Sequence, residues 1–175
     1  MSRVNLGCGG RPRPGYVNVD IREVEGVDIL ADVRDVEKIG IGQYEGFLAE
    51  HILEHFSFRE TVNILQLWRS LLTPGGGFQI DVPNGAWQVR AVVSGEIDWE
   101  QFVYYAYGEQ DYPENCHYTS FSQSSLQKAL EDAGFVDVSV SDIGQVLVAI
   151  GRNRTQIEQD AITAHDMMKD NYGYR

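Results

Sequence analysis

Short hydrophobic runs alternate with stretches of helical spacing along this chain. Five early runs have the length and composition of buried strands, and they cover residues 3–6, 17–19, 27–31, 44–49 and 78–82. Two later runs, 136–140 and 146–150, flank a turn near Gly144 and predict the closing strands. Strands that alternate with helical segments are typical of βαβ units and of a parallel sheet. The pattern therefore predicts an α/β fold.

Capping signals mark the predicted helices. Ser57 and Glu60 form a capping box, and apolar residues then recur at helical intervals until a Pro-Gly-Gly-Gly stretch: Val62, Leu65, Trp68 and Leu72. A second helix is expected after the N-cap Ser122, with a C′ glycine at Gly134. These two helices lie on either side of the fifth predicted strand in the sequence, as a βαβ arrangement requires.

Two further segments have a distinct composition. Residues 86–121 are rich in aromatic side chains: Trp87, Trp99, Phe102, Tyr104, Tyr105, Tyr107, Tyr112, Tyr118 and Phe121. A capping box at Thr155 and Glu158 starts a predicted helical tail, 153–175, whose apolar face carries Ala161, Ala164 and Met168. No internal repeat or low-complexity linker separates the segments, so residues 1–175 are expected to form a single domain.

The composition is that of a folded, acidic protein. Hydrophobic residues make up 43% of the chain, and 14 basic against 26 acidic residues give a formal net charge of −12. A strongly acidic surface repels phosphate backbones, which makes nucleic acid an unfavoured partner. No run has the apolar length of a membrane span, no signal peptide opens the chain, and two cysteines do not make a disulfide framework. We therefore expect a cytoplasmic protein with no membrane partner, and leave its oligomeric state open.

A glycine loop follows the first predicted strand, and an acid ends the second. Gly7, Gly9 and Gly10 let the backbone approach a ligand where a Cβ would clash. Only nine residues separate Gly10 from Asp20, and they include two prolines. A dinucleotide site needs a helix here to bind the pyrophosphate, and its acid lies about 20 residues beyond the glycines. The spacing therefore favours a nucleoside ligand without a pyrophosphate, and S-adenosylmethionine fits that description.

Acids end both the second and the third predicted strands. The Asp20 carboxylate can accept bonds from both hydroxyls of a ribose, and Asp32 or the Val33 amide can contact an adenine edge. Termination of the strands into solvent is the alternative explanation for both acids. Ligands of open α/β sheets bind at the carboxyl ends of the strands, which favours the binding-site interpretation.

Five motifs occur in a fixed order along residues 3–150. They are Asn-Leu-Gly-Cys-Gly-Gly at 5–10, Gly-Tyr-Val-Asn-Val-Asp at 15–20, Glu-His-Ile-Leu-Glu-His at 50–55, Leu-Thr-Pro-Gly-Gly at 72–76 and Ala-Gly-Phe at 133–135. Together they resemble class I S-adenosylmethionine-dependent methyltransferases, in particular the compact branch that lacks the helix after the first strand. The resemblance implies a Rossmann-like three-layer sandwich with a seven-stranded, mostly parallel sheet whose last strand is antiparallel. It also implies S-adenosylmethionine as the cofactor.

The same resemblance implies roles for particular residues. Those expected to bind the cofactor lie in the glycine loop and at the strand ends: Asn5, Gly7, Cys8, Gly9, Asp20, Ile21, Asp32, Val33 and Glu50. Gly7 and Gly9 correspond to the methionine end, Asp20 to the ribose and Asp32 to the adenine. The aromatic segment 86–121 is the expected substrate-side insert.

Methyl transfer makes modest chemical demands on the protein. A sulfonium methyl group is already a strong electrophile, so the acceptor mainly needs positioning, and a base helps when the acceptor is a hydroxyl or an amine. The expected catalytic residues are His51, Glu50 and His117. A partly buried hydrogen-bonding role is the alternative for each histidine.

The residues from His51 to His55 also match the His-x-x-Glu-His pattern of inverted zinc proteases. In that pattern, two histidines one turn apart on a helix bind zinc. Here the pattern directly follows a strand and precedes a helix start, so a long regular helix is not expected at this place. No metal site is predicted.

Two absences narrow the class of acceptor. No Pro-Pro-aromatic segment follows the fourth strand, and no Pro-Cys nucleophile is present. With the acidic charge, these absences favour a small-molecule, sugar or lipid-linked acceptor over nucleic-acid bases. A non-catalytic nucleoside-binding module of the same fold and a zinc hydrolase are the alternatives to a methyltransferase.

Overall fold

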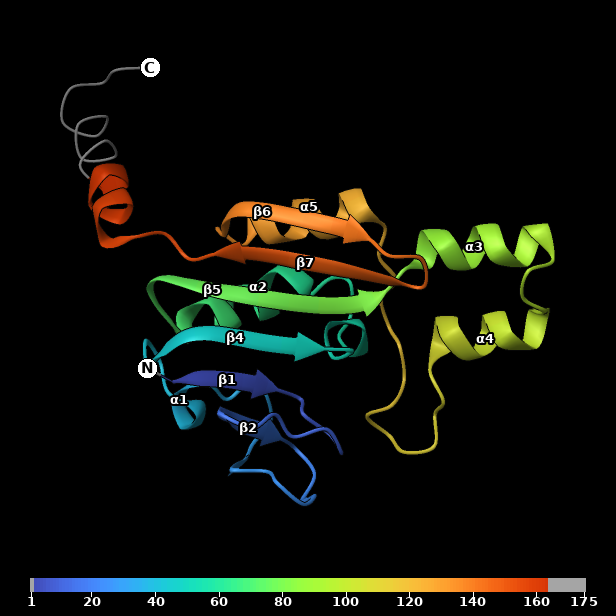
Figure 1. Ribbon diagram of the computed structural model, residues 1–175, viewed down its shortest axis with the longest axis horizontal. Helices are drawn as coiled ribbons and strands as arrows, with labels where there is room; N and C mark the ends of the chain where they lie inside the picture. The colour runs from blue at the N-terminus through green and yellow to red at the C-terminus, as the bar shows by residue number, and fades with distance from the viewer. Residues whose placement is uncertain (1, 164–175) are drawn as a thin grey trace.

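The computed structural model describes residues 2–163. Its strands form one sheet in the order β3-β2-β1-β4-β5-β7-β6 (Figure 1). They are β1 Arg3–Leu6, β2 Tyr16–Asp20, β3 Ile29–Leu30, β4 Tyr44–Glu50, β5 Leu72–Pro83, β6 Val136–Asp142 and β7 Val146–Arg152. Strand β7 is antiparallel to both of its neighbours, and the other neighbouring pairs are parallel. The predicted seven-stranded, mostly parallel sheet with an antiparallel last strand is confirmed.

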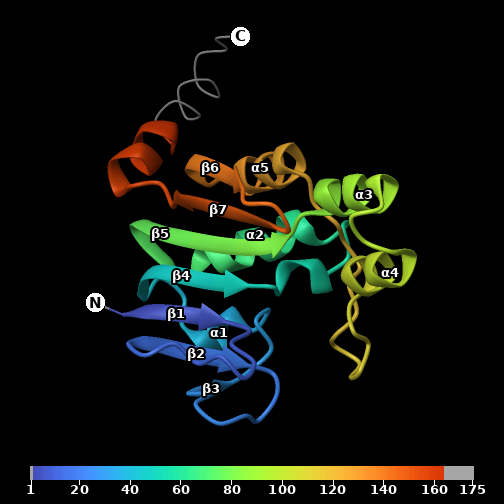
Figure 2. The same ribbon diagram turned by 45° about the vertical axis from the view of Figure 1, so that its right-hand side comes forward.

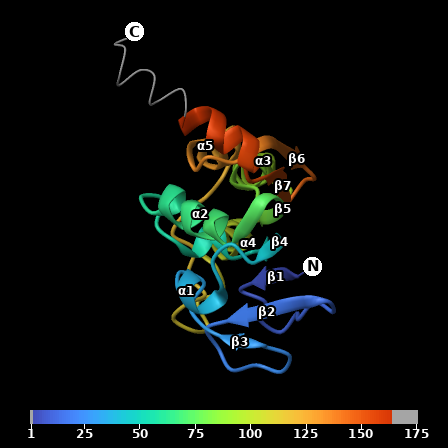
Figure 3. The ribbon, with the colours of Figure 1, turned by 90° about the vertical axis from the view of Figure 1, so that its left-hand side faces the viewer.

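The helices are unevenly distributed around the sheet. They are α1 Val36–Ile39, the 3₁₀ helix η1 Leu53–His55, α2 Thr61–Ser70, α3 Gly85–Ser94, α4 Trp99–Tyr107 and α5 Gln123–Asp132. Helices α1, α2 and α5 cover one face, and α3 and α4 lie beyond the carboxyl ends of the strands (Figures 1 and 3). Within residues 2–163, no helix covers the opposite face, which differs from the expected three-layer sandwich. The connections that right-handed crossovers place on that face, 7–15 and 21–28, contain turns and bends only.

The two faces of the sheet differ in polarity accordingly. Along β5, Phe78 and Ile80 are buried against the helices, whereas the alternate residues Gln79 and Asp81 are only half-buried. Phe78 stacks on Phe47 of β4 with ring centroids 5.6 Å apart, within the core beneath α2 and α5. Aromatic pairs of this kind contribute about 0.5–1.5 kcal/mol beyond the burial of their surface. The core therefore lies between the sheet and one layer of helices.

The loop 7–15 occupies the open face beside β1 and β2. Asn5 and Asn18 lie opposite each other in these strands, and their side chains share a hydrogen bond of 3.0 Å. Asn18 Oδ1 also accepts a bond of 2.7 Å from the Arg13 N–H, and Asn5 donates to the Arg11 carbonyl at 3.4 Å. These bonds satisfy two buried amides and hold the loop against the sheet without a helix. As the spacing from Gly10 to Asp20 predicts, no helix forms here.

Two details of the predicted first helix are wrong. The Ser57 hydroxyl accepts a bond from the Arg59 N–H instead of forming a capping box, and α2 begins at Thr61. Leu72 is the first residue of β5 and not part of the helix. Strand β5 is longer than predicted because it pairs with Tyr44 before it bulges at the Pro-Gly-Gly-Gly stretch. The predicted strand 27–31 is shortened to β3.

The other capping predictions are confirmed. Ser122 caps α5, and Gly134 follows that helix with φ +91°. Thr155 and Glu158 exchange the expected bonds, with the Thr155 N–H donating to Glu158 at 2.7 Å and the Glu158 N–H donating to the Thr155 hydroxyl at 3.3 Å. Helical conformation then runs from 156 to 163. Ala164 and Met168 of the predicted tail face lie outside the described residues.

Candidate active site

Two adjoining cavities lie at the carboxyl ends of the parallel strands. The first has a volume of about 540 Å³ and the second about 400 Å³. They share the lining residues Gly7, Arg22, His51, His55 and Tyr112. The residues that the sequence predicts for the site divide between them: Asn5, Cys8, Gly9, Glu50 and His117 line the first, and Asp20, Ile21, Asp32 and Val33 line the second. The structure thus brings every predicted site residue to one of two neighbouring cavities.

The glycine loop has a geometry that requires glycine at two positions. Gly7 has φ +65°, and a Cβ there would lie 2.7 Å from Ile52 Cδ1. Gly9 has φ +51° and donates its N–H to Asp20 Oδ2 at 2.7 Å. Both torsions lie in the left-handed region that favours glycine. The loop therefore turns between the two cavities with its backbone exposed to them.

Asp20 fixes this loop from the end of β2. Its side chain is almost completely buried, and each carboxylate oxygen accepts a backbone bond, from Gly9 at 2.7 Å and from Arg22 at 2.8 Å. A carboxylate oxygen can accept more than one hydrogen bond. The carboxylate can therefore hold the loop and still bind a hydroxyl group in the second cavity.

Asp32 and Val33 form the far wall of the second cavity. Arg34 Nε lies 2.9 Å and 3.0 Å from the two Asp32 oxygens, and this guanidinium lowers the pKa of the Asp32 carboxyl. The Val33 carbonyl accepts a bond of 3.2 Å from Trp68 Nε1 in α2. The wall is therefore fixed both by an ion pair and by the helical layer.

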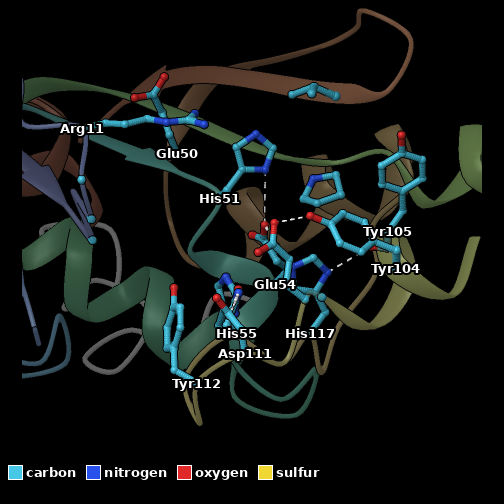
Figure 4. Close-up of a pocket in the computed structure, with 18 of the residues that line it drawn as sticks. Arg11, Glu50, His51, Glu54, His55, Tyr104, Tyr105, Asp111, Tyr112 and His117 are labelled. Carbon is cyan, nitrogen blue, oxygen red and sulfur yellow. Dashed lines mark hydrogen bonds and ion pairs between the residues drawn. The ribbon is translucent and has the colours of Figure 1, made fainter. Parts of the chain in front are cut away.

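Glu50 and His51 end β4 but have different surroundings. Glu50 forms a bidentate ion pair with Arg13, with contacts of 2.7 Å and 3.2 Å. His51 has φ +53°, which is uncommon for a residue with a Cβ, and it lines both cavities. Figure 4 shows its side chain in one of these cavities. Contact with the Glu54 carboxylate raises the pKa of His51, and burial raises the pKa of the nearby Asp81. A strained residue at a cavity junction is typical of a functional site.

Glu54 is a central residue that the sequence-based prediction of the site did not include. It is 1% exposed, and neither of its carboxylate oxygens has a hydrogen-bond partner. Its Oε1 lies 3.4 Å from His51 Nδ1 and 4.0 Å from His117 Nε2, which are loose ion-pair contacts (Figure 4). A buried carboxylate is costly unless it is well paired, and the loose contact with His51 is the shortest ion pair that the described residues give this group.

Residues 108–119, which we call the strap, run along both cavities between α4 and α5. The N–H groups of Tyr118 and Thr119 both donate to the Glu54 carbonyl, at 2.8 Å and 3.2 Å. Nearer the glycine loop, the Arg22 guanidinium lies 4.2 Å from the centroid of the Tyr112 ring. Such a cation–π contact contributes about 0.5–2 kcal/mol. The strap is therefore attached to η1 through Tyr118 and Thr119, and to the residues after β2 through Tyr112.

The aromatic segment contains two helices that its composition did not predict. Asn84 caps α3 by accepting the Trp87 N–H at 3.1 Å, and α3 packs against α4 beyond the strand ends (Figure 2). Trp87, Tyr104 and Tyr105 line the first cavity. His117 Nδ1 lies 3.1 Å from the Tyr105 carbonyl, and burial lowers the pKa of His117. The segment thus forms the wall of the first cavity opposite the sheet.

Solved structures show the same architecture at low sequence identity. A methyltransferase of Thermotoga maritima, described as S-adenosylmethionine-dependent and a possible histamine N-methyltransferase, has a TM-score of 0.64 and 16% identity over 87% of this chain and 82% of its own. A Burkholderia thailandensis 1,6-didemethyltoxoflavin-N1-methyltransferase with bound S-adenosylhomocysteine has a TM-score of 0.58 and 17% identity over 87% and 71%. The chain has the class I methyltransferase fold.

A third similar structure limits how far the comparison extends. A possible exported protein of Bordetella parapertussis has a TM-score of 0.64 and 14% identity, and the match covers 88% of this chain but 62% of that one. No protein-family model matches the sequence, and no curated protein matches it either. The likeness therefore establishes the methyltransferase fold and leaves activity and acceptor to be argued from the site.

No helix within residues 2–163 is long and apolar enough to cross a membrane.

Within this methyltransferase fold, the site residues missing from the sequence-based prediction come from the loops. Arg22 and Tyr112 meet across the cavities, but no spacing links them in the sequence. Glu54 does stand in a motif of the sequence, but its burial beside His117 could not be read from that motif, whereas His55 was already a candidate base alongside His51 and His117. The strand ends were predictable because parallel strands place their carboxyl ends at one edge of the sheet.

Proposed function

We propose that the protein is an S-adenosylmethionine-dependent methyltransferase that acts on a small-molecule, sugar or lipid-linked acceptor. The observation that carries this proposal is the pair of adjoining cavities at the carboxyl edge of a methyltransferase-type sheet, with His51 at their junction. Two substrates that exchange a group need two binding spaces that meet at the transferred atom. The bound S-adenosylhomocysteine of the Burkholderia enzyme supports the choice of cofactor.

The second cavity suits the adenosine part of the cofactor. Asp20 is placed to accept the ribose hydroxyls, while Asp32, Val33 and Ile21 border the space for the adenine. Because the Asp32 carboxylate is paired with Arg34, we assign base recognition chiefly to the backbone beside it. Ribose binding by Asp20 and adenine binding by this wall are parts of the proposal.

The methionine end of the cofactor then extends past Gly7 into the first cavity. The glycine loop and Glu50 border this region, together with Asn5 and Cys8. Glu50 is held by Arg13, so we place it beside the amino-acid end of the cofactor. Its predicted catalytic role remains a prediction.

The acceptor enters the first cavity from the side of the aromatic segment. Trp87, Tyr104 and Tyr105 offer faces on which a ring or an apolar chain can pack. His51 borders both spaces and is the proposed catalytic residue beside the transferred methyl group, and His117 lies at the acceptor end. In-line displacement at a sulfonium methyl needs mainly this positioning.

Titration calorimetry with S-adenosylhomocysteine tests the cofactor assignment directly. Wild type is expected to bind it at one site, and Asp20→Ala is expected to lose binding. NAD⁺ serves as the ligand control, because no helix N-terminus follows the glycine loop to bind a pyrophosphate. Absence of binding to wild type, or undiminished binding to Asp20→Ala, contradicts the proposal.

A non-catalytic module of the same fold is the second candidate. It would bind the cofactor but transfer no methyl group, so a labelled methyl donor and fractionated metabolite extracts distinguish the two. His51→Ala is expected to keep S-adenosylhomocysteine binding and to reduce transfer strongly. Transfer at the wild-type rate by His51→Ala would remove His51 from the catalytic residues.

A further inference from the structure

Three side chains with metal-binding atoms meet beside the first cavity. Glu54 and His55 come from η1, and His117 comes from the strap. One ligand atom from each lies within 4.8 Å of the other two (Figure 4). We propose that Glu54, His55 and His117 bind a divalent transition-metal ion, with Zn²⁺ as the best-suited ion.

The Glu54 carboxylate is the first observation behind this proposal. It is 1% exposed, neither oxygen has a hydrogen-bond donor, and its ion-pair contacts with His51 Nδ1 at 3.4 Å and His117 Nε2 at 4.0 Å are loose. Ionised carboxylates in protein interiors are paired or coordinate metals, because isolated burial of the charge is costly. A cation bound to Oε1 would pair this charge more closely than the loose contact with His51 does.

The hydrogen bonds of the two histidines are the second observation. His55 Nδ1 lies 3.1 Å from the Cys116 carbonyl, and His117 Nδ1 lies 3.1 Å from the Tyr105 carbonyl. A carbonyl oxygen can only accept, so each Nδ1 carries a proton, and in the neutral ring Nε2 then keeps its lone pair. Metal-binding histidines are commonly oriented in this way, with the second ring nitrogen donating to a backbone carbonyl. Both rings are therefore in the tautomer that binds a metal through Nε2.

The backbone brings the three residues together without help from a ligand. The Glu54 carbonyl accepts two bonds from the strap, at Tyr118 and Thr119, and this contact carries His117 to the Glu54 carboxylate. Two ligands of a tetrahedral zinc ion lie roughly 3.3 Å apart, from metal–ligand bonds of about 2.0–2.1 Å. His117 Nε2 and Glu54 Oε1 are 4.0 Å apart, so small side-chain rotations close the site.

Two imidazoles and one carboxylate form the ligand set of many catalytic zinc sites, in which the fourth position stays open. Here the first cavity borders the three ligands and provides space for that position. The proposed ligands therefore differ from those of zinc proteases, in which the two histidines of the His-x-x-Glu-His pattern bind the metal. Glu54 and His55 are adjacent ligands on a 3₁₀ turn, and His51 contacts the Glu54 carboxylate at 3.4 Å.

Metal binding by the untagged 175-residue chain tests the proposal. After treatment with EDTA and dialysis, wild type is expected to bind one Zn²⁺ per chain by elemental analysis, and Co²⁺ is expected to give visible ligand-field bands. In the wild-type protein, Zn²⁺ should also shift the imidazole signals of His55 and His117 in NMR spectra. Failure to bind Zn²⁺ or Co²⁺, in protein that is folded by circular dichroism, overturns the proposal.

Matched variants locate the site. Glu54→Gln and His117→Ala are expected to weaken Zn²⁺ binding by more than about 100-fold, beyond the 10–100-fold cost of outer-shell changes. Glu109→Gln is the control, because Glu109 lines the same cavity outside the cluster. Binding that survives in both ligand variants, or that Glu109→Gln weakens equally, contradicts the assignment. The result is independent of the S-adenosylhomocysteine titration, so each proposal can fail alone.

Discussion

Asp20 and Glu54 are both buried carboxylates at the carboxyl edge of the sheet, but their surroundings are opposite. Asp20 is 5% exposed and each oxygen accepts a backbone N–H, whereas Glu54 is 1% exposed and has no hydrogen-bond donor. Asp20 follows a strand directly, and Glu54 lies on the 3₁₀ turn after β4. One carboxylate therefore stabilises the chain that surrounds it, and the other does not.

The two carboxylates therefore have different roles in the site. Asp20 organises the backbone of the site, and Glu54 is available to bind a ligand. Asp20 shapes the glycine loop before any ligand arrives, so its substitution is expected to disturb folding and binding together. Glu54 accepts no hydrogen bond and has only loose ion-pair contacts with His51 and His117, and the proposed metal ion would be its close partner.

The largest expected effect comes from the same amide substitution at these two positions. Asp20→Asn places an NH₂ group against one of two backbone donors, and the unpaired amide is expected to cost about 1–3 kcal/mol of unfolding free energy. Glu54→Gln removes a buried charge whose only close ion pair among the described residues is the loose contact with His51, a 44% exposed side chain, so in EDTA it is expected to be nearly neutral. Urea unfolding of both variants and wild type in one buffer measures the difference. Equal destabilisation by the two substitutions would remove the contrast.

The sequence predicts the role of Asp20 better than it predicts the role of Glu54. Asp20 was predictable as a site residue because it ends a hydrophobic run a fixed distance after the glycines. Its bonds to Gly9 and Arg22 required the folded loop. Glu54 stands in two motifs of the sequence, but neither predicts that it is buried, because its burial depends on the distant strap.

The same reasoning applies to the fold. The strands of the sheet could be predicted from short hydrophobic runs, because the length of a run and the spacing of its apolar residues are local properties of the sequence. Helix α4 was missed because exposed aromatic side chains such as Trp99 and Tyr104 obscure its apolar stripe. In α3 the exposed residues Val89 and Val93 and the buried Gln88 have the same effect. The absence of helices on the open face of the sheet could be predicted for one connection only, the glycine loop, which is too short to contain a helix. The predicted capping box at Ser57 failed because η1 and a turn occupy the chain up to Thr61.

An intermediate effect is expected at Gly7, which lines both cavities. Gly7→Ala forces a Cβ to within 2.7 Å of Ile52 in a left-handed backbone, and is expected to cost about 2 kcal/mol. Gly10→Ala is the matched control, because no atom lies within 4 Å of its Cβ position. That control is expected to change stability by less than about 0.5 kcal/mol. Thermal unfolding of both variants, with and without S-adenosylhomocysteine, checks the result, and similar losses in the two would contradict the steric argument.

The smallest effect is expected at Asp32, a carboxylate that is paired but partly exposed. Arg34 lowers the pKa of Asp32 in the folded state, so its stabilising contribution is present above the unfolded pKa of about 3.9 and is lost as pH falls through the folded pKa. Side-chain exposures of 28% and 54% screen the pair, which limits the contribution to less than about 1 kcal/mol. Asp32→Asn is therefore expected to be slightly less stable than wild type at pH 7 and equal to it near pH 2, measured by urea unfolding at both values. A difference that grows towards acid pH would mean that burial of Asp32, and not its ion pair, controls the titration, and Asp32 would then resemble Glu54 more than Asp20.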